Sequence, residues 1–227
     1  MKSMLRMVCT ALVAALALAA VASASALASP EWHVRKKGTW SKVTTSVAVA
    51  PEAVKVGLAL GKEKEGFRCT STHSEGSIEA AGAGQLTRFP AVEEPGSHCE
   101  DVKGAGLNGC SKVDSITEGS LPWHTELYAE GSEIRAHLVG HAGGGVPSLR
   151  VECEGLLGRF TFECSGVTSL HMANNGTAGV VEGTFDSKSA KVKCVGGGGE
   201  PGEWLGTIKV KPTAKEVTNG IEAIKVE

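Results

Sequence analysis

Along most of the chain, apolar and polar residues alternate with a period of two. The alternation is strict in residues 149–154 and 160–164. It recurs in shorter runs at 43–49, 54–56, 77–79, 134–138 and 189–194. Successive side chains of a β-strand point to opposite faces, so this period predicts strands with one apolar face. No segment after residue 28 keeps an apolar helical period over three turns, and we therefore predict an all-β protein.

Glycine-rich and polar segments separate the predicted strands. They lie at residues 61–66, 94–96, 143–145, 174–176 and 196–202. Such segments are typical of turns and loops. We predict an antiparallel sandwich or barrel over residues 29–227, a length that suits one large β domain or two small ones. A boundary between two β subdomains, if present, falls best near residues 140–146.

The amino terminus has the pattern of a secretory signal peptide. Lys2 and Arg6 precede an apolar run at residues 8–22, and small residues follow up to Ala28. The run is shorter than the roughly 20 apolar residues that a membrane-spanning helix needs. We predict that residues 1–28 form a signal peptide cleaved after Ala28. The protein is then secreted, with no membrane span after cleavage.

The charge balance argues against a polyanionic partner. The full chain has a formal net charge of −2, and loss of Lys2 and Arg6 with the leader makes the secreted part more acidic still. Nucleic acids and anionic lipids call for a basic surface. We expect neither as a partner, and expect instead an unknown partner outside the cell or in the cell envelope.

Six cysteines remain after the predicted cleavage, an even number in a chain bound for an oxidising compartment. They are Cys69, Cys99, Cys110, Cys153, Cys164 and Cys194. This arrangement predicts three disulfides, and six cysteines allow fifteen connectivities. The chain has no C-x₂-C pair, which disfavours a cysteine metal site.

The predicted strands suggest one connectivity. If Gly158 and Arg159 form a two-residue hairpin turn, Cys153 lies directly opposite Cys164, within disulfide reach. Cys99 and Cys110 have the same separation, with glycines between them that allow the chain to turn back. We predict both pairs, which leaves Cys69–Cys194 by elimination.

The segment Leu121-Pro122-Trp123-His124-Thr125-Glu126-Leu127 lies between Cys110 and the predicted Cys153/Cys164 hairpin. With Pro30-Glu31-Trp32 near the predicted mature start, this arrangement resembles a group of uncharacterised secreted, cysteine-containing, β-rich proteins of actinobacteria. The resemblance implies an exported β-rich protein. It supplies no activity, ligand or catalytic residue.

Motifs for metal, cofactor and nucleophilic chemistry are missing or incomplete. His137 and His141 have the spacing of a zinc helix, but on a strand residues four apart stand about 13 Å apart, too far to share one ion. The chain has no G-x-S-x-G motif, and its glycine runs do not continue into a phosphate-binding loop. We therefore predict no cofactor, no metal site and no catalytic residue.

The most distinctive polar and aromatic cluster is Trp123, His124 and Glu126. In one interpretation these residues form a ligand surface, with Trp123 as a stacking platform. In the other, they are an ordinary alternating strand, with Trp123 and Thr125 on one face and the two polar residues on the opposite face. The second interpretation is favoured.

Two functional hypotheses follow. The favoured one is a non-catalytic extracellular or envelope-associated binding or structural module, because disulfide-braced β domains often carry specificity in their loops. The alternative is a secreted hydrolase whose site forms only in three dimensions. In that case His124, Glu126, His137 or Asp186 should converge on a hydroxyl or a water position.

Overall fold

The computed structural model places most of the chain beyond the predicted leader. It describes residues 29–60, 65–71, 74–88, 98–102, 110–119, 121–140, 146–155, 158–176, 179–185, 191–195 and 201–227. The predicted signal peptide, His141 and Asp186 lie outside these ranges.

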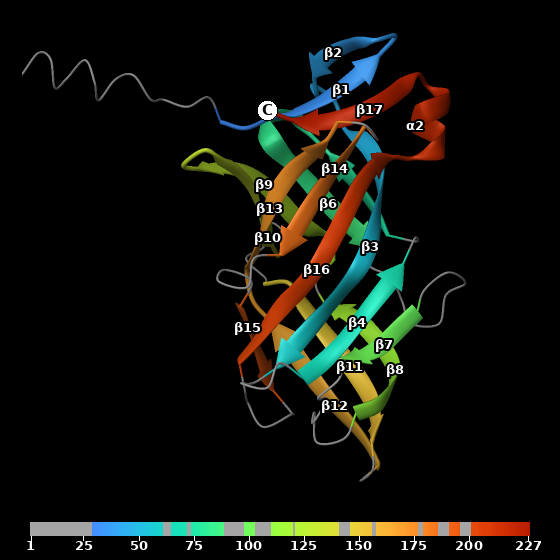
Figure 1. The fold of residues 1–227 in the computed structure, drawn as a ribbon, viewed down its shortest axis with the longest axis vertical. Coiled ribbons are helices and arrows are strands. Elements are labelled where there is room, and N and C mark those ends of the chain that lie inside the picture. Colours follow the sequence, from blue (N-terminus) through green and yellow to red (C-terminus); the bar gives the residue numbers. More distant parts are fainter. Residues whose placement is uncertain are drawn as a thin grey trace, which may run out of the picture.

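The described chain is nearly all β, as predicted (Figure 1). The first strands are β1 (Trp32–Lys36), β2 (Thr39–Lys42), β3 (Val47–Leu60), β4 (Glu65–Ser71), β5 (Glu75–Ile78), β6 (Ala83–Arg88), β7 (His98–Val102), β8 (Cys110–Gly119) and β9 (Trp123–Glu130). The others are β10 (Glu133–Val139), β11 (Ser148–Gly155), β12 (Gly158–Ser165), β13 (Thr168–Asn175), β14 (Val180–Phe185), β15 (Lys191–Val195), β16 (Pro201–Pro212) and β17 (Ile221–Val226). The described helices are short: η1 (Ala80–Gly82) and α2 (Ala214–Thr218).

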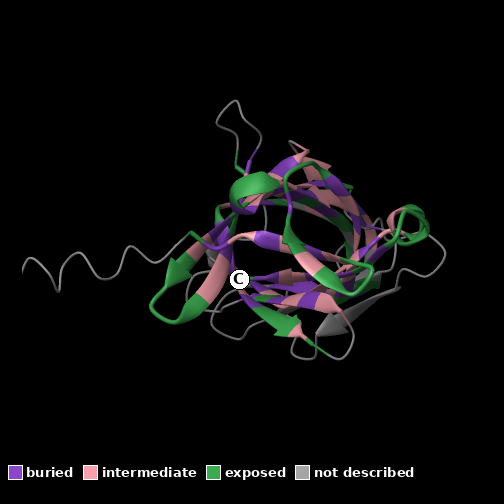
Figure 2. Cartoon of the chain, turned by 90° about the horizontal axis from the view of Figure 1, so that it is seen from above, coloured by how far each residue is buried: buried purple, intermediate pink, exposed green. Residues whose placement is uncertain are grey.

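Eight antiparallel strands close into a ring, which we call the upper tier. Their order is β3-β5-β6-β9-β10-β13-β14-β16, and pairing of β16 with β3 closes the ring. Seen end-on, the strands surround a central axis (Figure 2). Closure leaves none of these strands as an unpaired edge. Of the two predicted architectures, the fold is therefore the barrel.

A second set of strands extends the same barrel downward, and we call it the lower tier. On one side β4 and β7 follow β3, and on the other side β15, β12, β11 and β8 follow β16. Strands β7 and β8 lie side by side, with no hydrogen-bonded ladder between them in the described residues. Around each tier the strands follow one another in the order of the chain. The chain therefore passes back and forth between the two tiers as it goes round the barrel.

Strands β3 and β16 run the length of the barrel and bend where the tiers meet. They have 14 and 12 residues, and the register of their pairing shifts between Leu205 and Thr207. Gly206, at this bulge, has a φ of +101°, a value that favours glycine. A Cβ at this position would also clash with the backbone of Lys55. A bulge bends a strand locally, which accounts for the change of direction between the tiers.

Residues 140–146 do not separate two sheets. Strand β10 lies before this segment and pairs with β13, while β11 lies after it and pairs with β8. The sheet thus joins strands from both sides of the segment, because the chain alternates between the tiers instead of completing one before the other. Residues 141–145 are outside the described ranges.

A small cap sheet lies across the upper end of the barrel. Its strand order is β17-β1-β2, and β17 contacts β13, β14 and β16 (Figure 1). The side chains of Ile224 and Val226 on β17 are buried. The Asn174 amide donates to the Val226 carbonyl at 2.7 Å and accepts from the Val226 N–H at 2.8 Å, which ties the cap to β13. At the exposed end of β17, a hydrogen bond from Lys225 lowers the pKa of the Glu227 carboxyl.

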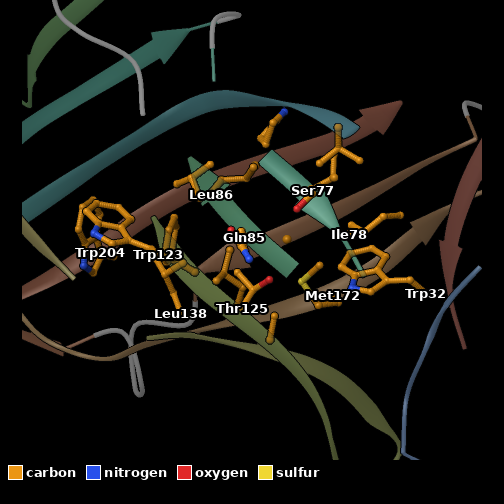
Figure 3. Close-up of a pocket in the computed structure, with 18 residues that line it drawn as sticks. Trp32, Ser77, Ile78, Gln85, Leu86, Trp123, Thr125, Leu138, Met172 and Trp204 are labelled. Atoms are coloured by element: carbon orange, nitrogen blue, oxygen red, sulfur yellow. The ribbon is translucent and has the colours of Figure 1, made fainter. Parts of the chain in front are cut away.

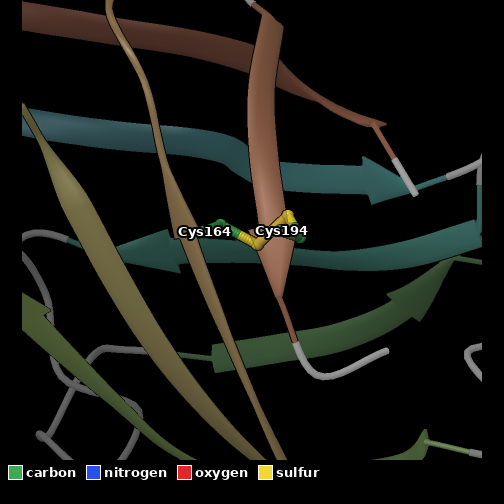
Figure 4. The surroundings of a disulfide bond; sticks show 2 residues. All are labelled: Cys164 and Cys194. Carbon is green, nitrogen blue, oxygen red and sulfur yellow. A yellow bond between two sulfur atoms is a disulfide. The ribbon is translucent and has the colours of Figure 1, made fainter. Parts of the chain in front are cut away.

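The disulfide that joins Cys164 to Cys194 corrects two predicted pairs. The two residues are directly opposite each other on β12 and β15, with their Cα atoms 4.0 Å apart (Figure 4). The predictions Cys153–Cys164 and Cys69–Cys194 are therefore wrong.

The error came from the position of the β11–β12 turn. Gly155 pairs with Gly158, so the hairpin turns before Gly158 and Arg159, and Phe160 lies opposite Cys153. Cys164 instead faces the strand on its other side, β15. A strand inside a sheet has two neighbours, and the alternation of residues does not show which of them carries the partner.

Cys69 is also in a disulfide. The register of β4 and β7 places Cys99 directly opposite it. The side chains of Cys99, Cys110 and Cys153 lie outside the description, so the predicted Cys99–Cys110 pair is not tested directly.

We expect non-reducing peptide mapping to find Cys164–Cys194 and Cys69–Cys99, with Cys110–Cys153 remaining. Directly opposed residues of antiparallel strands lie at Cα separations that a disulfide can bridge. A linked peptide containing Cys99 and Cys110 would contradict this assignment. The same digest after reduction is the control, because every linked peptide should then separate.

Candidate functional site

The upper tier encloses an apolar cavity of about 80 Å³. All eight strands of the tier contribute to its lining, together with β1 of the cap. The lining residues are Trp32, Val49, Pro51, Ser77, Ile78, Gln85, Leu86, Trp123, Thr125, Ala136, Leu138, Leu170, Met172, Gly183, Phe185, Trp204, Ile208 and Val210. Every second residue of a barrel strand points inward, so the period of two predicted from the sequence accounts for most of this lining. The adjacent pairs Ser77/Ile78 on β5 and Gln85/Leu86 on β6 depart from it.

Small residues leave part of the interior unfilled. Ala136 is buried and pairs with Leu170 on the neighbouring strand. At Gly183, a Cβ would lie 3.0 Å from Leu170 Cδ2 and 3.1 Å from Met172 Sδ. A side chain at Gly183 would displace these two lining side chains, and a larger side chain at Ala136 would enter the cavity that Ala136 lines. The cavity therefore depends on Ala136 and Gly183 remaining small.

Tryptophans lie at both ends of the cavity (Figure 3). Trp32, from the cap, lies at one end, and Trp123 and Trp204 lie at the other. The rings of Trp204 and Phe185 are stacked, with centroids 5.6 Å apart and an angle of 19° between their planes. Trp123 is fully buried, and its indole N–H donates to the Gly119 carbonyl at 2.8 Å. This end is therefore closed by packed rings.

Trp32 differs from Trp123 in its hydrogen bonding. It is only 3% exposed, yet its indole Nε1 has no hydrogen-bond partner. In Figure 3 this nitrogen is on the edge of the ring toward Met172, within the cavity lining. A buried donor without a partner typically costs about 1 to 3 kcal/mol. The cap end of the cavity thus contains an unused hydrogen-bond donor.

The lining carries no acid–base chemistry. None of the lining residues in the described chain is Asp, Glu, His, Lys, Arg or Cys. The polar side chains besides the indoles belong to Ser77, Gln85 and Thr125, and the Ser77 hydroxyl donates to the Glu79 carboxylate at 3.2 Å. An apolar cavity with few polar groups is the usual form of a small-molecule binding site.

The predicted cluster of Trp123, His124 and Glu126 does not form one ligand surface. Trp123 lines the cavity, as does Thr125, whereas Glu126 is exposed and His124 does not belong to the lining. The strand alternates as the favoured interpretation predicted, and the two polar residues point to the outer face. Thr125 is the cavity residue in this segment that the prediction left out of the ligand surface.

Of the residues predicted for the hydrolase alternative, His124, Glu126 and His137 lie on that outer face. His137 is directly opposite Glu126 on one side and Ser169 on the other. The Ser169 hydroxyl is hydrogen-bonded to the Tyr128 hydroxyl at 2.7 Å, and the Tyr128 ring lies 4.0 Å from the His137 ring, centroid to centroid. A nucleophile must lie within hydrogen-bond reach of its base. Ser169 is instead hydrogen-bonded to Tyr128, so Glu126, His137 and Ser169 do not have the geometry of an activated serine.

Sequence reasoning missed most of the cavity residues. Ala136, Gly183 and Trp32 were not predicted to belong to a ligand site, although Trp32 was part of the family resemblance and each of the three lies on the buried side of its strand. The sequence signal for such a position is a small residue on the apolar face of a predicted strand. Small residues are also common on strands that enclose no cavity, so this signal alone does not predict one.

Two further features of the described residues bear on the site. Within the described ranges, no three His, Cys, Asp or Glu side chains gather as metal ligands would. Among the described residues, no helix has the length and apolar character needed to cross a membrane.

The fold and the cavity define a class: an eight-stranded antiparallel barrel with an apolar interior space closed by a cap. Comparisons with known protein families, with curated proteins and with solved structures found no match.

Proposed function

We propose that this chain is a secreted, non-catalytic binding protein that holds a small apolar molecule in the upper tier of its barrel. The observation that carries the proposal is the apolar cavity, lined from all eight strands and bounded at one end by Trp32 of the cap. Ligand sites are typically preformed, concave and apolar. None of the described lining residues is titratable, which favours binding over chemistry.

The volume of the cavity restricts the ligand. At about 80 Å³ it is smaller than the roughly 150 Å³ engineered cavity that takes up benzene or xenon. The ligand that fits without rearrangement is therefore a molecule of only a few heavy atoms. A larger ligand requires the cap or the lining side chains to move.

Secretion is part of the proposal. The leader-like residues 1–28 and the even number of later cysteines support it, and the Cys164–Cys194 disulfide is compatible with an oxidising compartment. The binding site then faces the medium or the cell envelope.

The variant Ala136→Leu tests the cavity as the binding site. Its larger side chain occupies the space, so we expect affinity for small apolar probes to fall at least tenfold. Xenon and isobutene, which has four heavy atoms, are suitable probes, with binding followed by NMR shifts of the lining methyl groups. Because overpacking typically costs about 1 to 3 kcal/mol, the variant should still fold at low temperature, which circular dichroism checks.

The matched control is Ala129→Leu, the same change at an exposed position of β9. It should bind the probes as the unmodified protein does. The proposal fails if neither probe binds the unmodified protein, or if Ala136→Leu binds both unchanged. Hydrolytic turnover that disappears in His137→Ala would instead favour the enzyme hypothesis.

A further inference from the structure

We infer that the ligand of the cavity carries a neutral carbonyl oxygen, which accepts the indole N–H of Trp32. This inference rests on the proposed function and deepens it by naming the chemical class of the ligand. Its starting point is the buried, unpartnered Nε1 of Trp32 in the cavity lining.

The contrast between two tryptophans of the lining supports this role. Trp123 and Trp32 are both almost completely buried, and the N–H of Trp123 is taken up by the Gly119 carbonyl. Buried polar groups nearly always have a partner, and those without one call for an explanation. A ligand acceptor beside Trp32 supplies the missing partner, and the large burial of Trp32 prevents bulk water from doing so.

The remaining lining determines which acceptor suits the site. No charged side chain lies among the lining residues to balance a carboxylate or phosphate, and burying an isolated charge is strongly unfavourable. The acceptor is therefore neutral. An indole N–H donates only, so the ligand atom that it meets must accept, as the oxygen of a ketone, aldehyde or ester does.

The position of Trp32 orients the ligand. Trp32 is at the cap end of the cavity, and the packed rings of Trp123 and Trp204 are at the other end (Figure 3). The carbonyl thus points toward the cap, and the hydrocarbon part toward the two deeper tryptophans. Because Trp32 belongs to β1, the same hydrogen bond links the ligand to the cap sheet.

The test compares acetone with isobutene, two probes of four heavy atoms and nearly the same shape, of which only the ketone has an acceptor oxygen. In Trp32→Phe, which keeps an aromatic ring and removes the N–H, we expect affinity for acetone to fall about tenfold, as for loss of one buried hydrogen bond. Affinity for isobutene should change less than threefold. NMR titration measures both.

The matched control is Trp40→Phe, which makes the same change on β2 of the cap sheet. Trp40 does not belong to the cavity lining, and Arg35 and Lys225 pack on its ring. This variant should bind both probes as the unmodified protein does. If Trp32→Phe fails to fold, the indole N–H resonance of Trp32 in the unmodified protein decides: it should shift downfield with acetone and not with isobutene.

The outcomes separate the inference from the proposed function. If Trp32→Phe weakens both probes equally, or the Trp32 N–H resonance responds to both alike, Trp32 only fills space and the inference is wrong. If isobutene binds and acetone does not, the inference is wrong while the proposed function stands. If the unmodified protein binds neither of these probes nor xenon, the proposed function itself fails.

Discussion

The variant Trp123→Ala is expected to lose about 3 to 5 kcal/mol of unfolding free energy, the range for truncating a large aromatic side chain in a core. Trp123 is fully buried at the deep end of the cavity. The change removes its ring from the packed interior and leaves the Gly119 carbonyl without the indole donor. Urea unfolding followed by far-UV circular dichroism measures the loss.

The neighbouring residues of the same strand supply matched controls. Glu126 is exposed on the outer face of β9, so Glu126→Ala should change stability by no more than about 0.5 kcal/mol. Similar losses in Trp123→Ala and Glu126→Ala would mean that the two faces of β9 are assigned incorrectly. If Trp123→Ala is too unstable to purify, Trp123→Phe should show a smaller loss in the same direction.

The double variant Cys164→Ala, Cys194→Ala is expected to unfold with a free energy lower by about 3 to 4 kcal/mol. The disulfide joins residues 30 apart in sequence and links β12 to β15 in the lower tier. Without it, the unfolded chain gains the freedom that the closed loop had removed. The lower tier is also the part of the barrel in which β7 and β8 share no ladder among the described residues, so the bond braces strands of a tier that this pair does not close with hydrogen bonds.

Urea unfolding under oxidising conditions tests this loss, with Val195→Ala as the control. Val195 is next to Cys194 and is 65% exposed, so its truncation should have little effect. A loss of less than 1 kcal/mol in the double variant would contradict the expected role of the bond. The double variant should still bind cavity probes at low temperature, because the cavity is in the upper tier.

How far the candidate site could be predicted is clearest on β9. The alternation predicted that Trp123 and Thr125 share one face and that His124 and Glu126 share the other, and the structure confirms it. It could not show that the first face encloses a cavity. That depends on Ala136 and Gly183, which lie on β10 and β14 and meet Leu170 only when both strands pair with β13.

The disulfides show the same limit. Cys164 was placed correctly on the apolar face of its strand, where it is buried. Its partner was chosen from the nearest hairpin, and this choice depended on the residues that form the turn. A turn that begins a few residues earlier changes every cross-strand pair of the hairpin. The bond to Cys194 follows from the pairing of β12 with β15, which brings together residues 30 apart.

The sequence by itself determined that the chain forms β-strands and which side chains of a strand share a face, because both depend on a period of two within a few residues. Only the tertiary structure decided that the strands form one barrel with two tiers, that Cys164 bonds to Cys194, and that Trp32 lines one end of an apolar cavity. These features arise from pairings between distant segments, such as β3 with β16. A local pattern specifies the faces of a strand but not its neighbours, which are selected by the packing of the whole chain.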